Sequence, residues 1–145
     1  MLLNFPEYAF EFQILEQKKM IFDLVRKKFI PLTPEEWVRQ HCIAHLNQHF
    51  NFPLNNISIE REIRALDLRK RFDIVAFAKN GTPLVLVECK APNVKITQNT
   101  VIQAGVYNKK LDSPWMWITN GMQHVWLKKE GEKTSFCQPP NSIER

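Results

Sequence analysis

Cysteine is scarce in this sequence, and the cysteines that occur lie far apart. Cys42, Cys89 and Cys137 are odd in number and form no CxxC pair, which argues against a disulfide framework and against a cysteine-rich zinc site. No stretch approaches the roughly 18 consecutive apolar residues of a membrane span. The N-terminus has neither the basic flank nor the small-residue cleavage site of a signal peptide. We therefore expect a cytoplasmic protein that does not associate with a membrane.

Two further features are absent. The sequence contains no GxxxxGK[ST] phosphate-binding loop and no linker rich in proline, glycine or serine. Without the loop, ATP-driven translocation by this chain is excluded. Without a linker, the 145 residues are expected to form one domain, which is long enough to bury a core. Within it we expect an N-terminal strand or extension over residues 1–32, a core over residues 33–130 and a ragged tail over residues 131–145.

Positive charge is in excess and is clustered. The formal charge is +5 and the isoelectric point is about 9.2, which favours polyanionic partners without establishing them. One basic group comprises Lys18, Lys19, Arg26, Lys27 and Lys28. A second basic group comprises Arg61, Arg64, Arg69, Lys70 and Arg71. Both groups are equally consistent with phosphate contacts and with solvated strand ends and turns.

The hydrophobic pattern predicts a mixed α/β sheet with helices on its faces. The sequence around Thr33 and Glu36 has the form of a capping box, and Pro34 suits the first turn of a helix that would run to about residue 50. Two Asn-Gly pairs are typical of hairpin turns. The remaining predicted elements are one or two short strands over residues 10–30, strands at 57–63, 72–77, 84–90, 115–119 and 125–127, and a helix at 97–111.

The strand at residues 84–90 carries the most informative side chains. Glu88 and Lys90 are two residues apart, so they leave the same face of an extended strand. If a hairpin pairs this strand with the one before it, Asp73 lies near the same end, on the face that it shares with Val75 and Phe77. Two carboxylates together repel each other unless a cation lies between them, which is the arrangement that attracts Mg²⁺ or Mn²⁺. A buried ion pair of Lys90 with Glu88 or Asp73 is the alternative explanation.

Five short motifs occur in order along the chain. They are residues 33–40 (TPEEWVRQ), 71–75 (RFDIV), 87–92 (VECKAP), 103–107 (QAGVY) and 119–121 (TNG). Together they resemble the N-terminal nuclease domain of type I restriction enzyme R subunits, and small stand-alone proteins that share it, within the PD-(D/E)XK nuclease superfamily. The resemblance extends from about residue 20 to residue 127.

This resemblance implies a restriction-endonuclease-like fold, a mixed β-sheet flanked by helices, with a metal site. Asp73 and Glu88 would ligate Mg²⁺ or Mn²⁺, and the main-chain carbonyl of Cys89 would complete the site. Lys90 would act on the attacking water. The proline of the superfamily motif is absent, since Phe72 precedes Asp73, but the metal does not need it.

The resemblance also implies roles for residues on both helices. Glu36 matches the carboxylate that the first helix of the family supplies, with Glu35 as the alternative, although Glu36 is also explained as part of the helix cap. Gln103 and Tyr107 lie one turn apart and match a QxxxY motif, although a polar helix face explains them too. Arg39 can pair with either glutamate and orient it.

A zinc site is the main competing interpretation. His41, His45 and His49 repeat every four residues, as zinc-binding histidines on one helix face can. However, Cys42 stands where a HExxH hydrolase requires glutamate, and only His124 is available as a remote ligand. A wet or partly packed helix face explains these histidines better.

Two other constellations favour structure over chemistry. Cys89 should point away from Glu88 and Lys90 into the core, so it is a poor candidate nucleophile. The tryptophans Trp115, Trp117 and Trp126 are better explained by core packing than by base stacking.

Together these observations predict a metal-dependent endonuclease that hydrolyses phosphodiester bonds in DNA. The alternative is a nuclease-fold module that binds nucleic acid or a partner subunit without cutting, and a purely structural subunit fits the motif poorly. Expected partners are DNA, a translocase or specificity subunit, and a second copy in a homodimer. Phosphate contacts should dominate the affinity for DNA.

Overall fold

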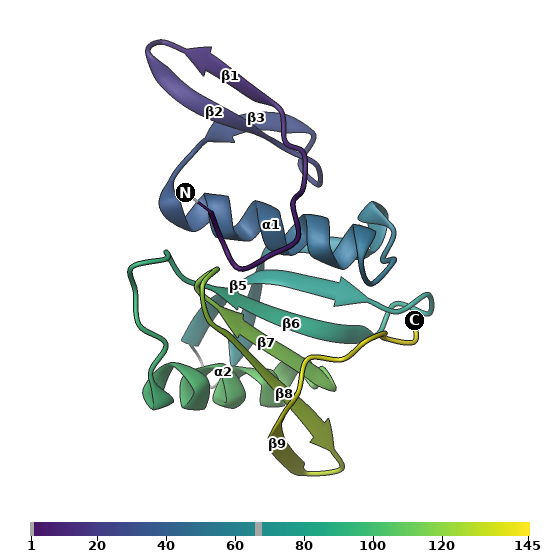
Figure 1. Ribbon diagram of the computed structural model, residues 1–145. Helices are drawn as coiled ribbons and strands as arrows, with labels where there is room; N and C mark the ends of the chain where they lie inside the picture. The colour runs from purple at the N-terminus through teal and green to yellow at the C-terminus, as the bar shows by residue number, and fades with distance from the viewer. Residues whose placement is uncertain (1, 66–67) are drawn as a thin grey trace.

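A mixed six-stranded sheet forms the centre of the molecule, and one helix covers each of its faces (Figure 1). The computed structural model describes residues 2–65 and 68–145, without the side chains of residues 60–65 and 68–71. Helix α1 (Pro34–Gln48) packs on one face and helix α2 (Gln98–Leu111) on the other. The strands in spatial order are β4 (Ile57–Ala65), β5 (Leu68–Phe77), β6 (Pro83–Cys89), β7 (Trp115–Thr119), β8 (His124–Glu130) and β9 (Lys133–Cys137).

A second, three-stranded antiparallel sheet projects beyond α1 (Figure 1). It consists of β1 (Phe12–Leu15), β2 (Lys18–Asp23) and β3 (Lys28–Pro31). The buried Asp23 carboxylate accepts the N–H groups of Val25 and Arg26 at 2.8 and 3.0 Å and so shapes the turn between β2 and β3. The prediction of one or two strands over residues 10–30 was therefore one strand short.

Both helices begin where the sequence predicts. The Thr33 hydroxyl accepts the Glu36 N–H at 3.0 Å, and Pro34 occupies the first turn of α1. The Thr97 hydroxyl caps α2 in the same way through the Thr100 N–H, at 3.3 Å. Among the described residues, no helix is long and apolar enough to cross a membrane.

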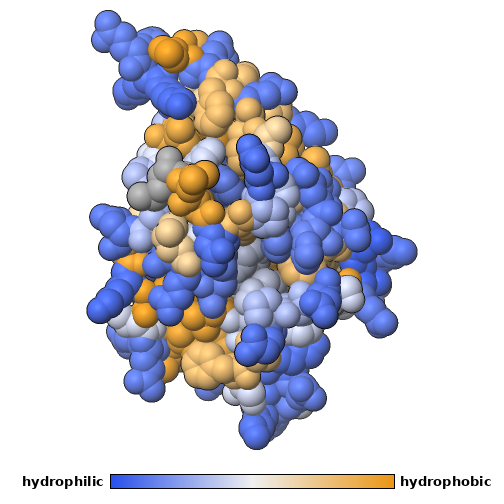
Figure 2. Space-filling view, viewed as in Figure 1, coloured by the Kyte–Doolittle hydropathy of each residue, from blue (hydrophilic) through white to orange (hydrophobic). Residues whose placement is uncertain are grey.

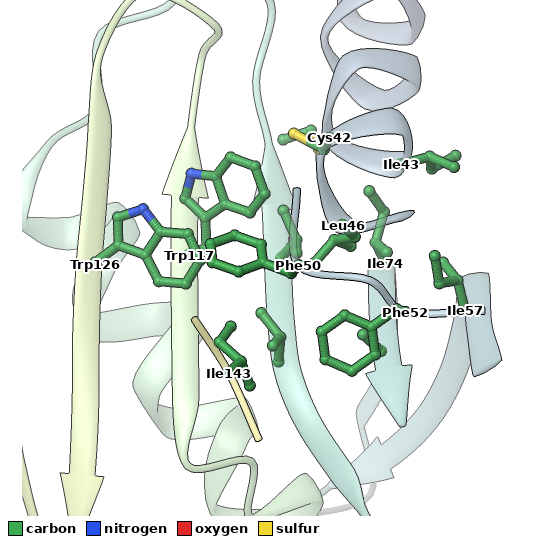
Figure 3. Close-up of a cluster of buried hydrophobic side chains, with 14 of the residues drawn as sticks. Cys42, Ile43, Leu46, Phe50, Phe52, Ile57, Ile74, Trp117, Trp126 and Ile143 are labelled. Atoms are coloured by element: carbon green, nitrogen blue, oxygen red, sulfur yellow. The ribbon is translucent and has the colours of Figure 1, made fainter. Parts of the chain in front are cut away.

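The larger core fills the space between α1 and the sheet (Figure 3). Trp117 and Trp126 stack there at 4.9 Å between ring centroids and are almost fully buried, so the predicted packing role of these two rings is confirmed. Trp115 is half-buried, and the Lys128 ammonium lies 3.9 Å from its ring centroid. Ile143 also belongs to this core. The tail predicted to be ragged is in fact ordered, because β9 pairs with β8 and Ile143 packs inside.

The smaller core lies between α2 and the opposite face of the sheet. Val75 of β5 and Leu86 of β6 contribute to it, and Ala104 of α2 packs against them. Leu86 and Val87 therefore point into different cores, as successive residues of a strand covered on both faces must. The continuous apolar character of residues 84–87 has its cause in this double coverage.

The N-terminal segment covers the histidine face of α1 (Figure 1). The Tyr8 hydroxyl lies 2.6 Å from His45 Nδ1, and the Phe5 ring packs between His41 and His124. Gly121 makes room for this segment, because a Cβ added there would lie 3.0 Å from side-chain carbons of Leu3, and its φ of +86° suits glycine. His41 is buried, His45 is half-buried and His49 is exposed, so the predicted partly packed helix face is confirmed.

Candidate active site

The site is organised by an irregularity at Asp73. Residues two apart in a regular strand share a face, but Phe72 packs in the α2-side core and Ile74 in the α1-side core. The paired residues of β5 and β6 extend from the Ile74–Val87 pair to the Phe77–Pro83 pair next to the hairpin turn. At the other end of this ladder, the Asp73 side chain itself accepts the Cys89 N–H at 2.8 Å. The break in alternation turns the Asp73 carboxylate toward α1.

The prediction that Asp73 shares a face with Val75 and Phe77 is therefore wrong. Those two side chains pack in the α2-side core, whereas Asp73 Oδ1 accepts a hydrogen bond from Arg39 Nη2 of α1 at 3.0 Å. The physical reason is that a carboxylate lowers its energy by reaching a guanidinium and a main-chain N–H, which outweighs regular pleating at one residue.

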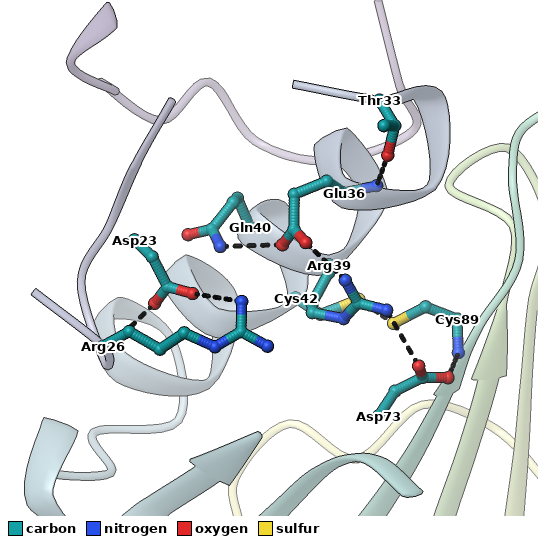
Figure 4. Close-up of polar contacts among 9 residues, drawn as sticks. All are labelled: Asp23, Arg26, Thr33, Glu36, Arg39, Gln40, Cys42, Asp73 and Cys89. Atoms are coloured by element: carbon teal, nitrogen blue, oxygen red, sulfur yellow. Dashed lines mark hydrogen bonds and ion pairs between the residues drawn. The ribbon is translucent and has the colours of Figure 1, made fainter. Parts of the chain in front are cut away.

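Arg39 is the centre of a buried polar network on α1 (Figure 4). Its Nη1 donates to Glu36 Oε1 at 2.5 Å while its Nη2 donates to Asp73. Gln40 Nε2 donates to the other Glu36 oxygen at 3.0 Å. Burial by itself would lower the pKa of Arg39, but the Glu36 and Asp73 carboxylates raise it overall, so the guanidinium is fixed in its charged form.

The two glutamates of the first helical turn have different surroundings. Both Glu36 oxygens are engaged by α1 side chains, and its N–H completes the helix cap. Glu35 is exposed, yet its pKa is raised, first by partial burial of the carboxyl group and then by the Asp73 carboxylate, against the opposing effects of Arg39 and Lys90. Glu35 thus shares one electrostatic environment with Asp73 and Lys90.

Glu88 and Lys90 lie at the C-terminal end of β6. Glu88 is 5% exposed and lies opposite Ile118 of the parallel strand β7. Since Cys89 packs in the α1-side core, the alternation of β6 directs Glu88 to the other face. Lys90 is half-buried, and its N–H donates to the Thr119 carbonyl at 2.8 Å. Asp73 and Glu88 follow the Ile74–Val87 pair at this end of the antiparallel β5–β6 ladder, so their main chains are neighbours.

The donor chemistry at this position suits a hard divalent cation. Asp73, Glu88 and the Cys89 carbonyl offer oxygen ligands only, and Mg²⁺ is commonly bound by one or two carboxylates together with water. The predicted convergence of the two carboxylates is not seen, however, because Asp73 is turned toward α1 whereas Glu88 is directed to the α2 side of the sheet. Among the residues that the structure describes, no group of three or more histidine, cysteine or acidic side chains is placed to hold a metal ion. The charge of Asp73 is balanced by Arg39 in the arrangement seen.

The two α2 residues differ in exposure. Tyr107 is half-buried, and its ring packs edge-on against Phe72 at 6.3 Å between centroids, next to Asp73 in the chain. Gln103 is exposed. The structure therefore brings Tyr107 to the residue that precedes Asp73, while Gln103 lies on the open side of the helix.

The competing constellations are parts of the core. Cys89 Sγ lies 3.9 Å from Cys42 Sγ, and this contact followed by burial raises the pKa of Cys89, so the thiol stays protonated. His41 Nδ1 lies 2.8 Å from the Trp37 carbonyl oxygen, and His45 is engaged by Tyr8. The packing role predicted for Cys89 is thus confirmed.

Two contributors were not predicted from the sequence. Gln40 is fully buried and holds Glu36, and its position four residues after Glu36 on one helix face was the available signal. The Cys89 N–H holds Asp73, which no residue-type pattern could reveal. The side chains of the basic group at residues 61–71 lie outside the described part of the structure.

Comparison with known proteins points in one direction. The family described as type I restriction enzyme R protein N terminus matches residues 34–140 of this chain. A search of curated proteins finds no match. A crystal structure of a candidate nuclease of the DUF820 group, from Anabaena variabilis ATCC 29413, is 16% identical and aligns over 93% of this chain and 80% of its own, with a TM-score of 0.50. At this identity the likeness concerns the fold alone, and the predicted nuclease-like mixed α/β architecture is confirmed.

Proposed function

The chain belongs to the family of type I restriction enzyme R protein N-terminal domains, whose model spans residues 34–140, and on that premise we propose that it is a metal-dependent nuclease that hydrolyses phosphodiester bonds in DNA. The observation that carries the proposal is the placement of Asp73. A break in strand alternation turns its carboxylate toward α1, where Arg39 and the Cys89 N–H hold it in one orientation. Such fixed carboxylates are typical of sites that must hold a reacting group in place.

In the proposed reaction a water oxygen forms a new bond to phosphorus, the bond from phosphorus to the leaving nucleotide oxygen breaks, and the proton lost by the water is balanced by one taken up at the leaving oxygen. Mg²⁺ or Mn²⁺, which supplies Lewis-acid stabilisation of the phosphate charge, would be held by Asp73, Glu88 and the Cys89 carbonyl once the two carboxylates turn toward each other from the opposite faces on which they lie. The Lys90 ammonium orients the attacking water and stabilises negative charge on the phosphate.

Glu35 is the α1 carboxylate that we place at the substrate. It is exposed at the start of α1, where the charges of Asp73 and Lys90 act on it. Glu36 acts through Arg39 instead, because both of its oxygens are engaged within α1. On α2, the Tyr107 ring packs on Phe72 and so supports the main chain next to Asp73. Gln103 is exposed and available to contact a nucleic-acid strand.

The proposal is tested by a plasmid-nicking assay with Mg²⁺ or Mn²⁺ on Asp73→Asn, Glu88→Gln and Lys90→Met. Each variant should lose cleavage by at least about 100-fold, the lower end of what a positioned acid or base contributes. Glu130→Gln, an exposed change on β8, is the matched control and should cut normally. Wild-type rates in all three site variants would overturn the proposal.

A second function, binding without cleavage, has one observation in its favour. Asp73 is neutralised by Arg39 from the same chain, so a metal ion would have to share or replace that partner. Isothermal titration with Mn²⁺ separates the two functions. Metal binding that disappears in Asp73→Asn supports the nuclease, whereas DNA binding that persists in EDTA, with no cleavage of any DNA, supports a binding module.

The partners that follow from either function remain proposals. DNA is the first, and its phosphates would meet the exposed lysines of the projecting sheet. A translocase or specificity subunit could supply target choice, and a homodimer could cut both strands. Size-exclusion chromatography with light scattering, with and without DNA, tests the homodimer.

A further inference from the structure

A cleft of about 560 Å³ lies between the projecting β1–β3 sheet and the start of α1. Phe12 of β1, Lys19 of β2, Trp37 of α1 and Pro92 from the loop after β6 form its walls. This volume is within the range of small-ligand sites, which is roughly 300–1,000 Å³. Figure 2 shows hydrophobic residues gathered where the projecting hairpin joins the body, with hydrophilic residues around them.

The walls of the cleft combine aromatic rings with a cation. The rings of Phe12 and Trp37 lie 6.0 Å apart between centroids, tilted by 39°. The Lys19 ammonium lies 4.8 Å from the Phe12 ring centroid. Phe12 is 45% exposed, although it is a large apolar side chain. A flat aromatic ligand that carries negative charge matches these walls, since its ring can stack and its charge can meet the lysine.

The cleft adjoins the candidate active site. Pro34, which lines it, directly precedes Glu35, and Pro92 follows Lys90 by two residues. The loop that carries Pro92 is held in shape, because the Val94 N–H donates to the Ala91 carbonyl and the Val94 carbonyl accepts from the Asn120 amide, both at 2.9 Å. A ligand in the cleft would therefore be next to a phosphate at the Asp73–Lys90 position.

We propose that this cleft binds one unstacked nucleobase of a DNA strand, stacked on the exposed Phe12 ring beside Trp37, while an adjoining phosphate lies at the candidate active site. The inference rests on the proposed function for the position of that phosphate. It names the substrate class as single-stranded DNA or DNA with unpaired bases, because a base inside a duplex is stacked and cannot enter such a cleft. The exposed Lys19, which lines the cleft, gives it the positive charge that a nucleic-acid strand needs.

The test measures binding of a fluorescent oligothymidylate in EDTA, where no cleavage occurs, together with a series of strands in which one abasic site is moved along the sequence. Phe12→Ala and Phe12→Leu remove the ring, and the second keeps apolar bulk. Ile14→Ala is the matched control, since Ile14 lies on the same strand, is 75% exposed and does not line the cleft. Thermal unfolding of each variant checks that the fold is intact.

Loss of the ring should weaken binding of the intact strand by about 5- to 150-fold, the usual effect of removing one stacking partner. One abasic strand should be bound equally by wild type and Phe12→Ala, because it already lacks the base that stacks. Ile14→Ala should bind like wild type. Lys19→Gln should weaken binding more than Lys18→Gln, the neighbouring change on the opposite face of β2.

The inference is overturned if Phe12→Ala and Ile14→Ala bind alike, if the Phe12→Ala loss is the same on every abasic strand, or if the protein binds no oligonucleotide. In those cases the cleft accepts something else, such as an apolar segment of a partner protein. Nicking assays on the same samples separate this result from the proposed function. If the protein cuts DNA but Phe12→Ala and the abasic strands show no linked effect on binding, only the proposal for the cleft fails. If the linked effect is present but DNA is never cut, only the proposed nuclease activity fails.

Discussion

Arg39→Met should strongly destabilise the protein. The Arg39 side chain is 8% exposed and bridges Glu36 and Asp73, whose side chains are 9% and 17% exposed, with N–O distances of 2.5 and 3.0 Å. Methionine keeps much of the aliphatic length but removes the positive charge. Two carboxylates would then remain close together with little solvent and no cation between them.

The magnitude follows from this burial. Breaking a buried ion pair by removing one partner costs about 3–5 kcal/mol, because the remaining charge is left uncompensated. Gln40 and the Cys89 N–H still donate to the two carboxylates, so we expect a value near the lower end, about 3 kcal/mol. That is a large part of the roughly 5–15 kcal/mol by which domains are stable.

Urea unfolding followed by circular dichroism measures this loss. Lys129→Met is the matched control: it removes the Lys129–Asp112 ion pair, in which the Asp112 side chain is 69% exposed, and should cost no more than about 1 kcal/mol. Adding Glu36→Gln to Arg39→Met should recover part of the stability, since one of the two stranded charges is removed. An Arg39→Met protein within about 1 kcal/mol of wild type, or a double variant that is no more stable, would refute the reasoning.

Three further predictions concern His45, Asn108 and the two glutamates at the start of α1. Burial, followed by two neighbouring histidines, lowers the pKa of His45 from 6.5 to about 4. The folded state thus disfavours protonation of His45. The stability that depends on neutral His45 is fully present above pH 6.5 and is lost as the pH falls toward 4. We expect the free energy of unfolding to fall by about 1–2 kcal/mol after solvent screening, measured by urea unfolding at each pH. Asn108→Ala removes both hydrogen bonds to Ser113 beyond α2 and should cost about 2 kcal/mol by the same assay. Glu35→Gln should lower nicking without changing stability, whereas Glu36→Gln should lower stability.

Each of these has its own contrary outcome. A free energy of unfolding that does not change between pH 6.5 and pH 4 would contradict the lowered pKa of His45. Asn99→Ala, an exposed change on α2, is the control for Asn108→Ala, and equal losses in the two variants would contradict the contribution of the Asn108–Ser113 hydrogen bonds. Equal effects of Glu35→Gln and Glu36→Gln on nicking and stability would show that the two glutamates are not distinguished by their surroundings.

Local rules predicted most of the elements. Thr33 and Pro34 mark the start of α1 because a hydroxyl cap and a preset φ act within one helical turn. The Asn80-Gly81 turn and the apolar run that follows it predict the β5–β6 hairpin, since glycine adopts the positive φ of +88° that the turn requires. These signals depend only on near neighbours in the chain.

Non-local contacts explain the errors. The C-terminal tail has little apolar character of its own. Strand β9 forms because β8 offers a free edge, and Ile143 is buried because it packs into the core between α1 and the sheet. The third strand of the projecting sheet depends in the same way on pairing with β2. Neither the free edge of β8 nor the core around Ile143 can be predicted from the residues of the tail itself.

The sequence by itself determined the α/β class, the two helices, the central strand with Glu88 and Lys90, and the family, because periodicity, capping and motif order are properties of the chain. Only the tertiary structure decided which way Asp73 faces and which of Glu35 and Glu36 has both carboxylate oxygens engaged within α1. Both depend on Arg39, which reaches across from α1 to β5. A charged group buried between two elements is oriented by whichever partners the packing brings to it, and that choice exists only once the chain has folded.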